Sequence, residues 1–226
     1  MKPKYLSLIA AVLALSLTPL ATAGTPLICF PFDIGNAQSL PWVHDKGIGS
    51  PQNTYDTKQL AADTINLLGQ NVPVIVRMET LRRAALYIEK DASAGRQLLE
   101  RLKERSAGGK TGRNALAVFD HGYFMETMNQ LRRDRTYLSG AAGTREGYTL
   151  VREAIQLRGH DPEMEFAAAV ITVWPKLPQH EEHLRNAVAG VPTDSLLADN
   201  LLSHFPSVSG TVADLRSGKT GSSKRR

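Results

Sequence analysis

The chain has 226 residues, of which 42% are hydrophobic and 22% are charged, and it contains a single cysteine. This composition is that of a globular protein, and one cysteine excludes an internal disulfide. The net charge of +5 would suit a nucleic-acid partner, but the basic excess lies at the two ends of the chain. Residues 24–205 carry 20 basic and 21 acidic side chains, so no nucleic-acid partner is expected.

The beginning of the chain has the three parts of an export signal. Lys2 and Lys4 provide a positive start, "LSLIAAVLALSL" is an apolar run, and the small residues "ATA" end at Ala23. The apolar run is too short to span a bilayer as a helix. We therefore expect residues 1–23 to be a signal peptide that is cleaved between Ala23 and Gly24. The mature chain is then exported, periplasmic or secreted, without a transmembrane segment.

Residues 24–52 are rich in proline and glycine and show no helical periodicity, which predicts an irregular, extended lead-in that packs onto the rest of the chain. The cysteine, Cys29, stands here in the stretch "LICFPF". The residues before it do not match a lipoprotein signal, so lipidation is not expected. Its apolar neighbours favour a buried, inert thiol. An intermolecular disulfide and a reactive thiol remain as alternatives.

Residues 53–205 have helical patterning almost throughout, and no alternating strand pattern competes with it. The predicted helices start near residues 54, 74, 92, 114, 144, 162, 178 and 194. The helix after Pro73 carries its apolar residues at steps of four and three, which place them on one face. The helix that starts at Asp161-Pro162 and runs to Trp174 is apolar on nearly all sides. We expect this last helix to form the centre of the core.

The last 21 residues, from Pro206 to Arg226, change in composition. They include five basic side chains and a run of glycine and serine, "SGKTGSSKRR". Such a segment is too polar to bury much apolar surface, which predicts a disordered basic tail over 206–226.

Three segments of the helical zone share one pattern, in which arginine, alanine and aspartate recur at fixed positions. They are "LRRAALYIEKD" from Leu81, "VREAIQLRGHD" from Val151 and "LRNAVAGVPTD" from Leu184, at separations that suit a repeat near 34 residues. The alanine allows two helices to approach closely, and the aspartate can cap the next helix.

This pattern resembles the tetratricopeptide family of helical hairpins. The resemblance implies an all-α, irregular array of antiparallel hairpins with a concave face that binds a protein or a peptide. The bulky-Leu-Gly-Tyr pattern of that family's first helix is missing from the chain, and a compact, non-repeating helical bundle remains the alternative.

Two short motifs suggest a phosphate or metal site but lack part of what the site needs. "GGKT", from Gly108 to Thr111, lacks the earlier glycine of a phosphate loop and follows a predicted helix where a strand is required. "HEEH" places His180 and His183 three residues apart, with no obvious third metal ligand. We interpret "HEEH" as a solvated first helical turn, and we expect no metal, cofactor or assignable catalytic residue.

Two further groups of charged residues have an ordinary structural interpretation. Asp120 and His121 are adjacent in "FDHGY", so in a helix they point apart and are expected to form a surface pair. The recurring arginines Arg82, Arg152 and Arg185 could bind an acidic ligand along a groove. We expect instead that their stems pack across the hairpins and that their charged ends stay in water.

Two classes of function are compatible with these observations. The first is an exported, non-catalytic scaffold that binds a protein or peptide partner, as the tetratricopeptide resemblance implies. The second is an exported all-α hydrolase acting on the cell wall or another extracytoplasmic substrate, with Glu163, Glu165 or the histidines as its acid or base. The sequence shows neither a paired acid and base nor a nucleophile motif, and the scaffold is therefore preferred.

Overall fold

The computed structural model describes residues 25–44, 47–69, 71–108, 112–134 and 146–216, and it is mostly helical. The lead-in contains a short helix α1 (Pro26–Cys29) and two strands, β1 (Trp42–Val43) and β2 (Ser50–Pro51), which pair antiparallel with Trp42 opposite Pro51. The all-α fold class is therefore confirmed, and the lead-in is mainly irregular, as predicted. None of the described helices is long and apolar enough to span a membrane.

The helices follow one another with short connections. Their bounds are η1 Thr57–Gln59, α2 Leu60–Leu67, α3 Val74–Ile88, α4 Ala92–Ala107, α5 Ala115–Asp134, α6 Glu146–Arg158, α7 Pro162–Val173, α8 His180–Ala189, α9 Leu196–His204, η3 Pro206–Val208 and α10 Ser209–Arg216. Asp91 and Asp161 accept hydrogen bonds from the first backbone N–H groups of α4 and α7, as their positions predicted. Ser195, rather than the expected Asp194, caps α9.

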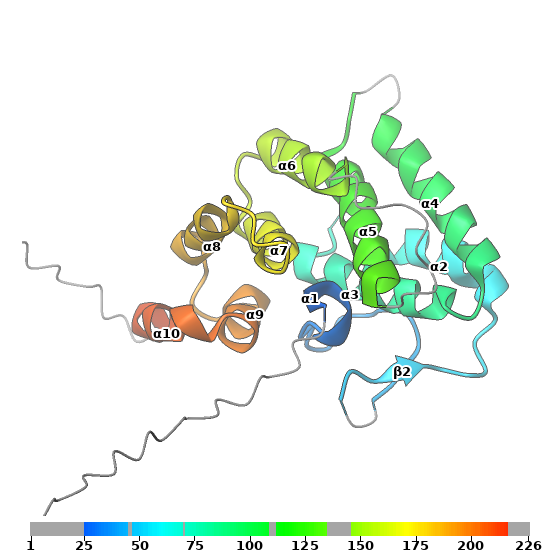
Figure 1. The fold of residues 1–226 in the computed structure, drawn as a ribbon, viewed down its shortest axis with the longest axis horizontal. Helices are drawn as coiled ribbons and strands as arrows, with labels where there is room; N and C mark the ends of the chain where they lie inside the picture. Colours follow the sequence, from blue (N-terminus) through cyan, green and yellow to red (C-terminus); the bar gives the residue numbers. More distant parts are fainter. Residues whose placement is uncertain (1–24, 45–46, 70, 109–111, 135–145, 217–226) are drawn as a thin grey trace, which may run out of the picture.

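The helices are arranged around α3 and α7. Helix α5 packs against α6 and α7 packs against α8, while α3 contacts α1, α2, α4, α5 and α7 (Figure 1). In the view of Figure 1, α2 and α4 lie on one side of this centre, and α8, α9 and α10 lie on the other. The helix α7 is buried over most of its length, as its composition predicted.

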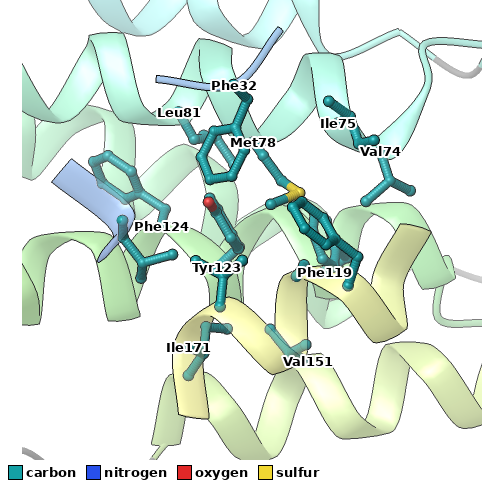
Figure 2. Close-up of a cluster of buried hydrophobic side chains, with 14 of the residues drawn as sticks. Phe32, Val74, Ile75, Met78, Leu81, Phe119, Tyr123, Phe124, Val151 and Ile171 are labelled. Carbon is teal, nitrogen blue, oxygen red and sulfur yellow. The ribbon is translucent and has the colours of Figure 1, made fainter. Parts of the chain in front are cut away.

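The core joins apolar side chains from the lead-in and from all the described α-helices. Figure 2 shows Met78 of α3 near Phe119 and Tyr123 of α5, with Phe32 of the lead-in and Ile171 of α7 around them. All five side chains are buried. The lead-in is therefore part of the core, because Phe32 packs edge-to-face against Phe166 of α7.

Helices α5 and α6 approach closely where each has a glycine. A Cβ atom on Gly147 would lie 2.6 Å from the backbone oxygen of Gly122, so no larger residue fits without a backbone shift. The alanines at the equivalent positions of the three similar segments, Ala84, Ala154 and Ala187, are all fully buried. The two glycines thus set the separation of α5 and α6, and the three alanines are core positions.

The prediction of a disordered tail is wrong for residues 206–216. These residues form η3 and α10, which pack against α9. Val208 and Val212, four residues apart, lie on one face of this segment, and Val212 is fully buried. Two apolar residues at helical spacing are enough to dock a short helix onto an existing surface, although the average composition of the segment is polar. Residues 217–226 of the predicted tail lie outside the described residues.

Candidate functional site

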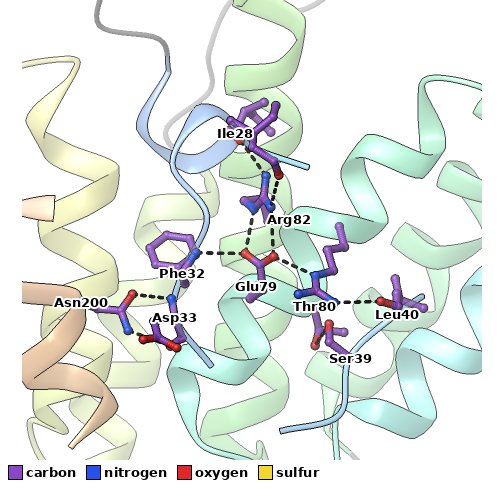
Figure 3. A network of polar contacts seen from close by, with 11 residues as sticks. Ile28, Phe32, Asp33, Ser39, Leu40, Glu79, Thr80, Arg82 and Asn200 are labelled. Atoms are coloured by element: carbon purple, nitrogen blue, oxygen red, sulfur yellow. Dashed lines mark hydrogen bonds and ion pairs between the residues drawn. The ribbon is translucent and has the colours of Figure 1, made fainter. Parts of the chain in front are cut away.

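The helix α3 carries a buried network of three charged side chains. Glu79 is three residues before Arg82 and four before Arg83, a spacing that places the three side chains on one side of the helix. The Oε2 atom of Glu79 accepts hydrogen bonds from Arg82 Nε at 2.7 Å and from the Phe32 backbone N–H at 3.1 Å. Its Oε1 atom accepts from Arg83 Nε at 2.8 Å and from Arg82 Nη2 at 3.0 Å. The carboxylate thus has four donors (Figure 3).

The two guanidinium groups bind backbone oxygens of the lead-in. Arg82 donates from Nη1 to Ile28 at 2.9 Å and from Nη2 to Ile48 at 3.2 Å. Arg83 donates from Nη1 to Leu40 at 3.0 Å. Leu40 and Ile48 lie outside helices and strands, and Ile28 lies in the short helix α1, whose last carbonyl groups have no partner within the helix. The arginines therefore satisfy these three carbonyl groups. The network therefore holds the lead-in against α3.

Further hydrogen bonds tie the lead-in to α9 and to α3. Asn200 of α9 accepts from the Asp33 N–H at 2.9 Å and donates to the Asp33 backbone oxygen at 2.8 Å (Figure 3). The hydroxyl of Tyr87 donates to the Pro41 oxygen at 2.5 Å and accepts from the Gln52 N–H at 3.0 Å. The lead-in is thereby tied to the helical body at several points along its length.

A cavity of about 420 Å³ lies between α3 and two parts of the lead-in, residues 31–37 and residues 42–49. We call it the α3 cavity. Glu79 and Arg83 form its floor, and the apolar side chains Phe32, Trp42 and Ile48 line its walls. Asp33 and His44, both exposed, also line it. A concave site that combines apolar walls with a few buried polar groups is typical of ligand-binding pockets.

The buried network beneath the α3 cavity carries an excess positive charge, and Arg83 is the arginine of this network that lines the cavity. Two guanidinium groups oppose one carboxylate, and Arg82, Arg83 and Glu79 are 0%, 7% and 1% exposed. The Trp42 ring lies 5.3 Å from the Arg82 guanidinium carbon and 5.5 Å from that of Arg83, within cation–π range. Among the described residues, none accepts a hydrogen bond from Arg83 Nη2. A positive donor group is therefore left at the floor of the cavity.

A second cavity, of about 680 Å³, lies where the N-termini of α3, α5, α7 and α9 meet. Glu163 lines it, and its Oε2 atom accepts a hydrogen bond from the Ile75 N–H at 3.3 Å. Burial raises the pKa of Glu163 above its ordinary value, partly offset by hydrogen bonds from the backbone of α3. Of the two carboxylates considered for a hydrolase, Glu163 is the one that lines a described cavity.

Glu165 belongs instead to a buried chain of hydrogen bonds. Its Oε2 atom lies 2.6 Å from His183 Nδ1, and His183 Nε2 lies 2.7 Å from the Tyr148 hydroxyl. His160 and Asn186 contact the other oxygen of Glu165, Oε1, at 3.0 and 3.2 Å. Burial acts to raise the Glu165 pKa, but the hydrogen bonds from the histidines and Asn186 outweigh it and lower the pKa overall. These hydrogen bonds join α6, α7 and α8.

The two histidines of "HEEH" have different partners. The Nδ1 atom of His180 lies 3.1 Å from the Ala169 backbone oxygen, whereas His183 is 8% exposed and is bound by Glu165 and Tyr148. The expectation of a solvated turn therefore fails for His183, because apolar neighbours on α8 turn this side of the helix into the core. Within the described residues, no group of three or more His, Cys, Asp or Glu side chains could hold a metal ion.

The predicted surface pair of Asp120 and His121 is half wrong. The two residues do point apart, but Asp120 is fully buried and accepts a hydrogen bond from Arg77 Nη1 at 2.6 Å. Burial raises the pKa of Asp120 to about 6, against the opposing effect of Arg77. His121 bonds Ser106 Oγ at 2.9 Å and lines a third cavity, of about 700 Å³, between α4, α5 and α6.

The three recurring arginines do not behave alike. Arg152 and Arg185 are exposed, as expected, whereas Arg82 is fully buried in the α3 network. The expectation for Arg82 was wrong because the lead-in, which is distant in sequence, supplies acceptors that replace water.

Two sequence predictions remain, one for the "GGKT" motif and one for Cys29. The "GGKT" motif falls mainly on residues 109–111, outside the described residues. Cys29 is half-buried and lies 3.9 Å from Thr25 Oγ1, while its neighbour Phe30 is 43% exposed. The thiol is thus less enclosed than its apolar neighbours predicted.

Sequence reasoning missed the residues of the α3 cavity. The motif "ETLRR" places an acid and two bases at helical spacing, which was the available signal. The same spacing occurs on many solvated helix faces, so it does not by itself indicate burial. The lead-in was expected to pack onto the rest of the chain, but nothing in the sequence placed its Trp42 beside two arginines.

No protein-family model, curated protein or solved structure matches the chain.

Proposed function

We propose that the protein is an exported, non-catalytic helical binding protein that captures a protein or peptide partner in the α3 cavity. The observation that carries this proposal is the buried guanidinium group of Arg83 at the floor of a cavity with aromatic walls, within a network of net charge +1. Cavities of this kind fix a ligand through few polar contacts and gain affinity from the apolar walls.

The state of Glu79 favours binding over turnover at this cavity. Its carboxylate already accepts four hydrogen bonds, two of them to each oxygen. A general acid or base must exchange a proton with its ligand, which here would break this network. A rigid network suits a site that holds a ligand in one orientation.

The expected array of hairpins belongs to the same proposal. The α5–α6 and α7–α8 pairs support it, as does the burial of Ala84, Ala154 and Ala187 at equivalent positions. In a tetratricopeptide-like arrangement, the α3 cavity would occupy the end of the array that the lead-in covers.

A substitution that fills the cavity tests the proposal. Ala37 lines the cavity and is exposed, so Ala37→Trp should block it without touching the charged network. Gln38→Trp places the same ring on the neighbouring exposed position, which is not among the lining residues. Cross-linking in the producing cell, followed by mass spectrometry, should recover the same partner with wild type and Gln38→Trp and lose it with Ala37→Trp. Equal recovery with both variants would contradict the proposal.

Export is tested separately. The signal at residues 1–23 predicts that mass spectrometry of the protein isolated from a periplasmic extract or from the medium gives a chain that starts at Gly24, without an acyl group on Cys29. A soluble chain that retains Met1 would contradict the export prediction.

One observation favours the alternative, an exported hydrolase. Glu163 has a raised pKa and lines the cavity of about 680 Å³, and a general acid needs both properties. If this alternative is correct, Glu163→Gln should abolish hydrolysis of cell-wall material by the purified protein, while Ala37→Trp should leave it unchanged. Absence of hydrolysis by the wild-type protein would remove the alternative.

A further inference from the structure

We infer that the α3 cavity binds a carboxylate group of the partner and that Arg83 is the residue that binds it. This inference rests on the proposed function and names the chemistry of the group that is captured. It is carried by the charge at the floor, the free edge of one guanidinium and the balance of charges around the cavity.

The buried charges beneath the α3 cavity are unbalanced. Glu79, Arg82 and Arg83 together carry a net charge of +1, and each is more than nine-tenths buried. A buried charge is costly unless an opposite charge is close to it. The described residues lining the cavity include one further acid, Asp33, which is exposed and whose Oδ1 atom accepts the Gly35 N–H at 2.8 Å. A singly charged anion at the floor would balance the network.

Arg83 has one guanidinium edge that is free to bind a ligand. Its Nε atom donates to Glu79 and its Nη1 atom to the Leu40 oxygen. The described contacts leave both hydrogens of Nη2 and one of Nη1 without an acceptor. Neighbouring Nη1 and Nη2 hydrogens form the planar pair that binds both oxygens of a carboxylate. Arg82 is not available in the same way, because it donates to Glu79, Ile28 and Ile48.

The charge of the network favours a carboxylate over a phosphate. A carboxylate brings one negative charge, which matches the net charge of Glu79, Arg82 and Arg83 together. A phosphate group near neutral pH brings closer to two, which would leave an uncompensated negative charge in a partly apolar cavity near Asp33. The walls formed by Phe32, Trp42 and Ile48 suit the apolar atoms that flank a carboxylate in a peptide.

Two kinds of peptide carboxylate share this chemistry, an acidic side chain and the C-terminus of a chain. Three probes separate them. N-acetyl-alanyl-glutamate amide has only a side-chain carboxylate, N-acetyl-alanyl-alanine has only a main-chain carboxylate, and N-acetyl-alanyl-glutamine amide has neither. Binding is followed by Trp42 fluorescence in a Trp174→Phe background, because the chain has two tryptophans.

We expect at least one carboxylate probe to bind about tenfold or more tightly than the glutamine probe, the discrimination that a charge-assisted hydrogen bond provides. The probe that binds identifies the source of the carboxylate. Equal binding of all three probes would overturn the inference while leaving peptide capture intact. No binding of either carboxylate probe would also overturn it. The proposed function fails separately, if Ala37→Trp leaves the cross-linked partner unchanged.

Two substitutions test the role of Arg83 on the full chain. Asp33→Asn keeps an acceptor for the Gly35 N–H and removes the opposing charge, so the carboxylate probe should bind several-fold more tightly. Arg83→Gln should reduce its binding about tenfold or more, with the melting temperature measured alongside because Arg83 also holds Leu40. A carboxylate affinity that neither substitution changes would overturn the assignment, and Asp33→Asn provides this test even if Arg83→Gln does not fold.

Discussion

The helices α3 and α7 are both buried on nearly all sides, but their sequences differ sharply. All fifteen residues of α3 are buried, including Arg77, Glu79, Arg82 and Arg83. Nine residues of α7 are buried, and Glu165 is the only one of them that carries a formal charge. The helix α7 is buried because its side chains are apolar, whereas α3 is buried because each of its charges has partners.

This difference shows two ways to build the centre of a helical protein. Burial of apolar surface in α7 is favourable wherever the helix lies, because the hydrophobic effect is not directional. Burial of charges in α3 is favourable only when the partners are present at hydrogen-bond distance. The stability of α3 therefore depends on contacts with distant segments, namely the lead-in and Asp120 of α5.

The largest expected effect follows from removing the acid of the α3 network. Glu79→Gln leaves two buried guanidinium groups without a carboxylate, and we expect the free energy of unfolding to fall by about 3–5 kcal/mol. Urea denaturation followed by circular dichroism measures this change. Glu100→Gln, at an exposed position of α4, is the control and should change stability by less than about 0.5 kcal/mol. Similar values for the two variants would show that α3 does not depend on its charges.

A smaller effect is expected from overpacking α7. Ala168 is fully buried, so Ala168→Leu should reduce the free energy of unfolding by about 1–3 kcal/mol. The matched control is Ala189→Leu at the exposed end of α8, for which we expect little change. If the two leucine variants unfold at the same urea concentration, α7 is not closely packed.

The buried acid that pairs with α3 gives a pH dependence. Burial raises the pKa of Asp120 to about 6, so between about pH 4 and pH 6 the folded state binds this proton more tightly than the unfolded chain. Its contribution to stability therefore falls as the pH rises through this range. Compared with Asp120→Asn, the wild-type protein should lose about 1–2 kcal/mol more between pH 4 and pH 7. Parallel stability profiles of the two proteins would contradict this assignment.

The smallest expected effect concerns one contact between α3 and the lead-in. Tyr87→Phe removes the hydroxyl that bonds Pro41 and Gln52, and it should cost about 1 kcal/mol. Hydrogen exchange should show faster exchange at Gln52, with little change in α7. An equal increase in the exchange rate across α3 and α7 would mean that this contact does not anchor the lead-in locally.

The sequence was a good guide where burial follows from apolar composition. The apolar run from Phe166 to Trp174 correctly indicated a core helix, and the capping residues Asp91 and Asp161 marked where helices begin. It was a poor guide to the C-terminal segment, where two valines at helical spacing outweigh a polar composition. The export signal and the hairpin array stay predictions.

The candidate site could be predicted only in fragments. The spacing of Glu79, Arg82 and Arg83 allows ion pairs on a helix, but a solvated helix and a buried one look the same at this level. Their burial depends on backbone oxygens of Ile28, Leu40 and Ile48, and backbone groups carry no sequence signal.

The sequence by itself therefore determined the helical class of the fold, most of the helix positions and the apolar centre at α7, because local periodicity and capping act between near neighbours in the chain. Only the tertiary structure decided which charges are buried and where a cavity forms. A charge enters the interior when partners that are distant in sequence reach it. For Arg82 and Arg83 those partners lie 34 to 54 residues away, in the lead-in.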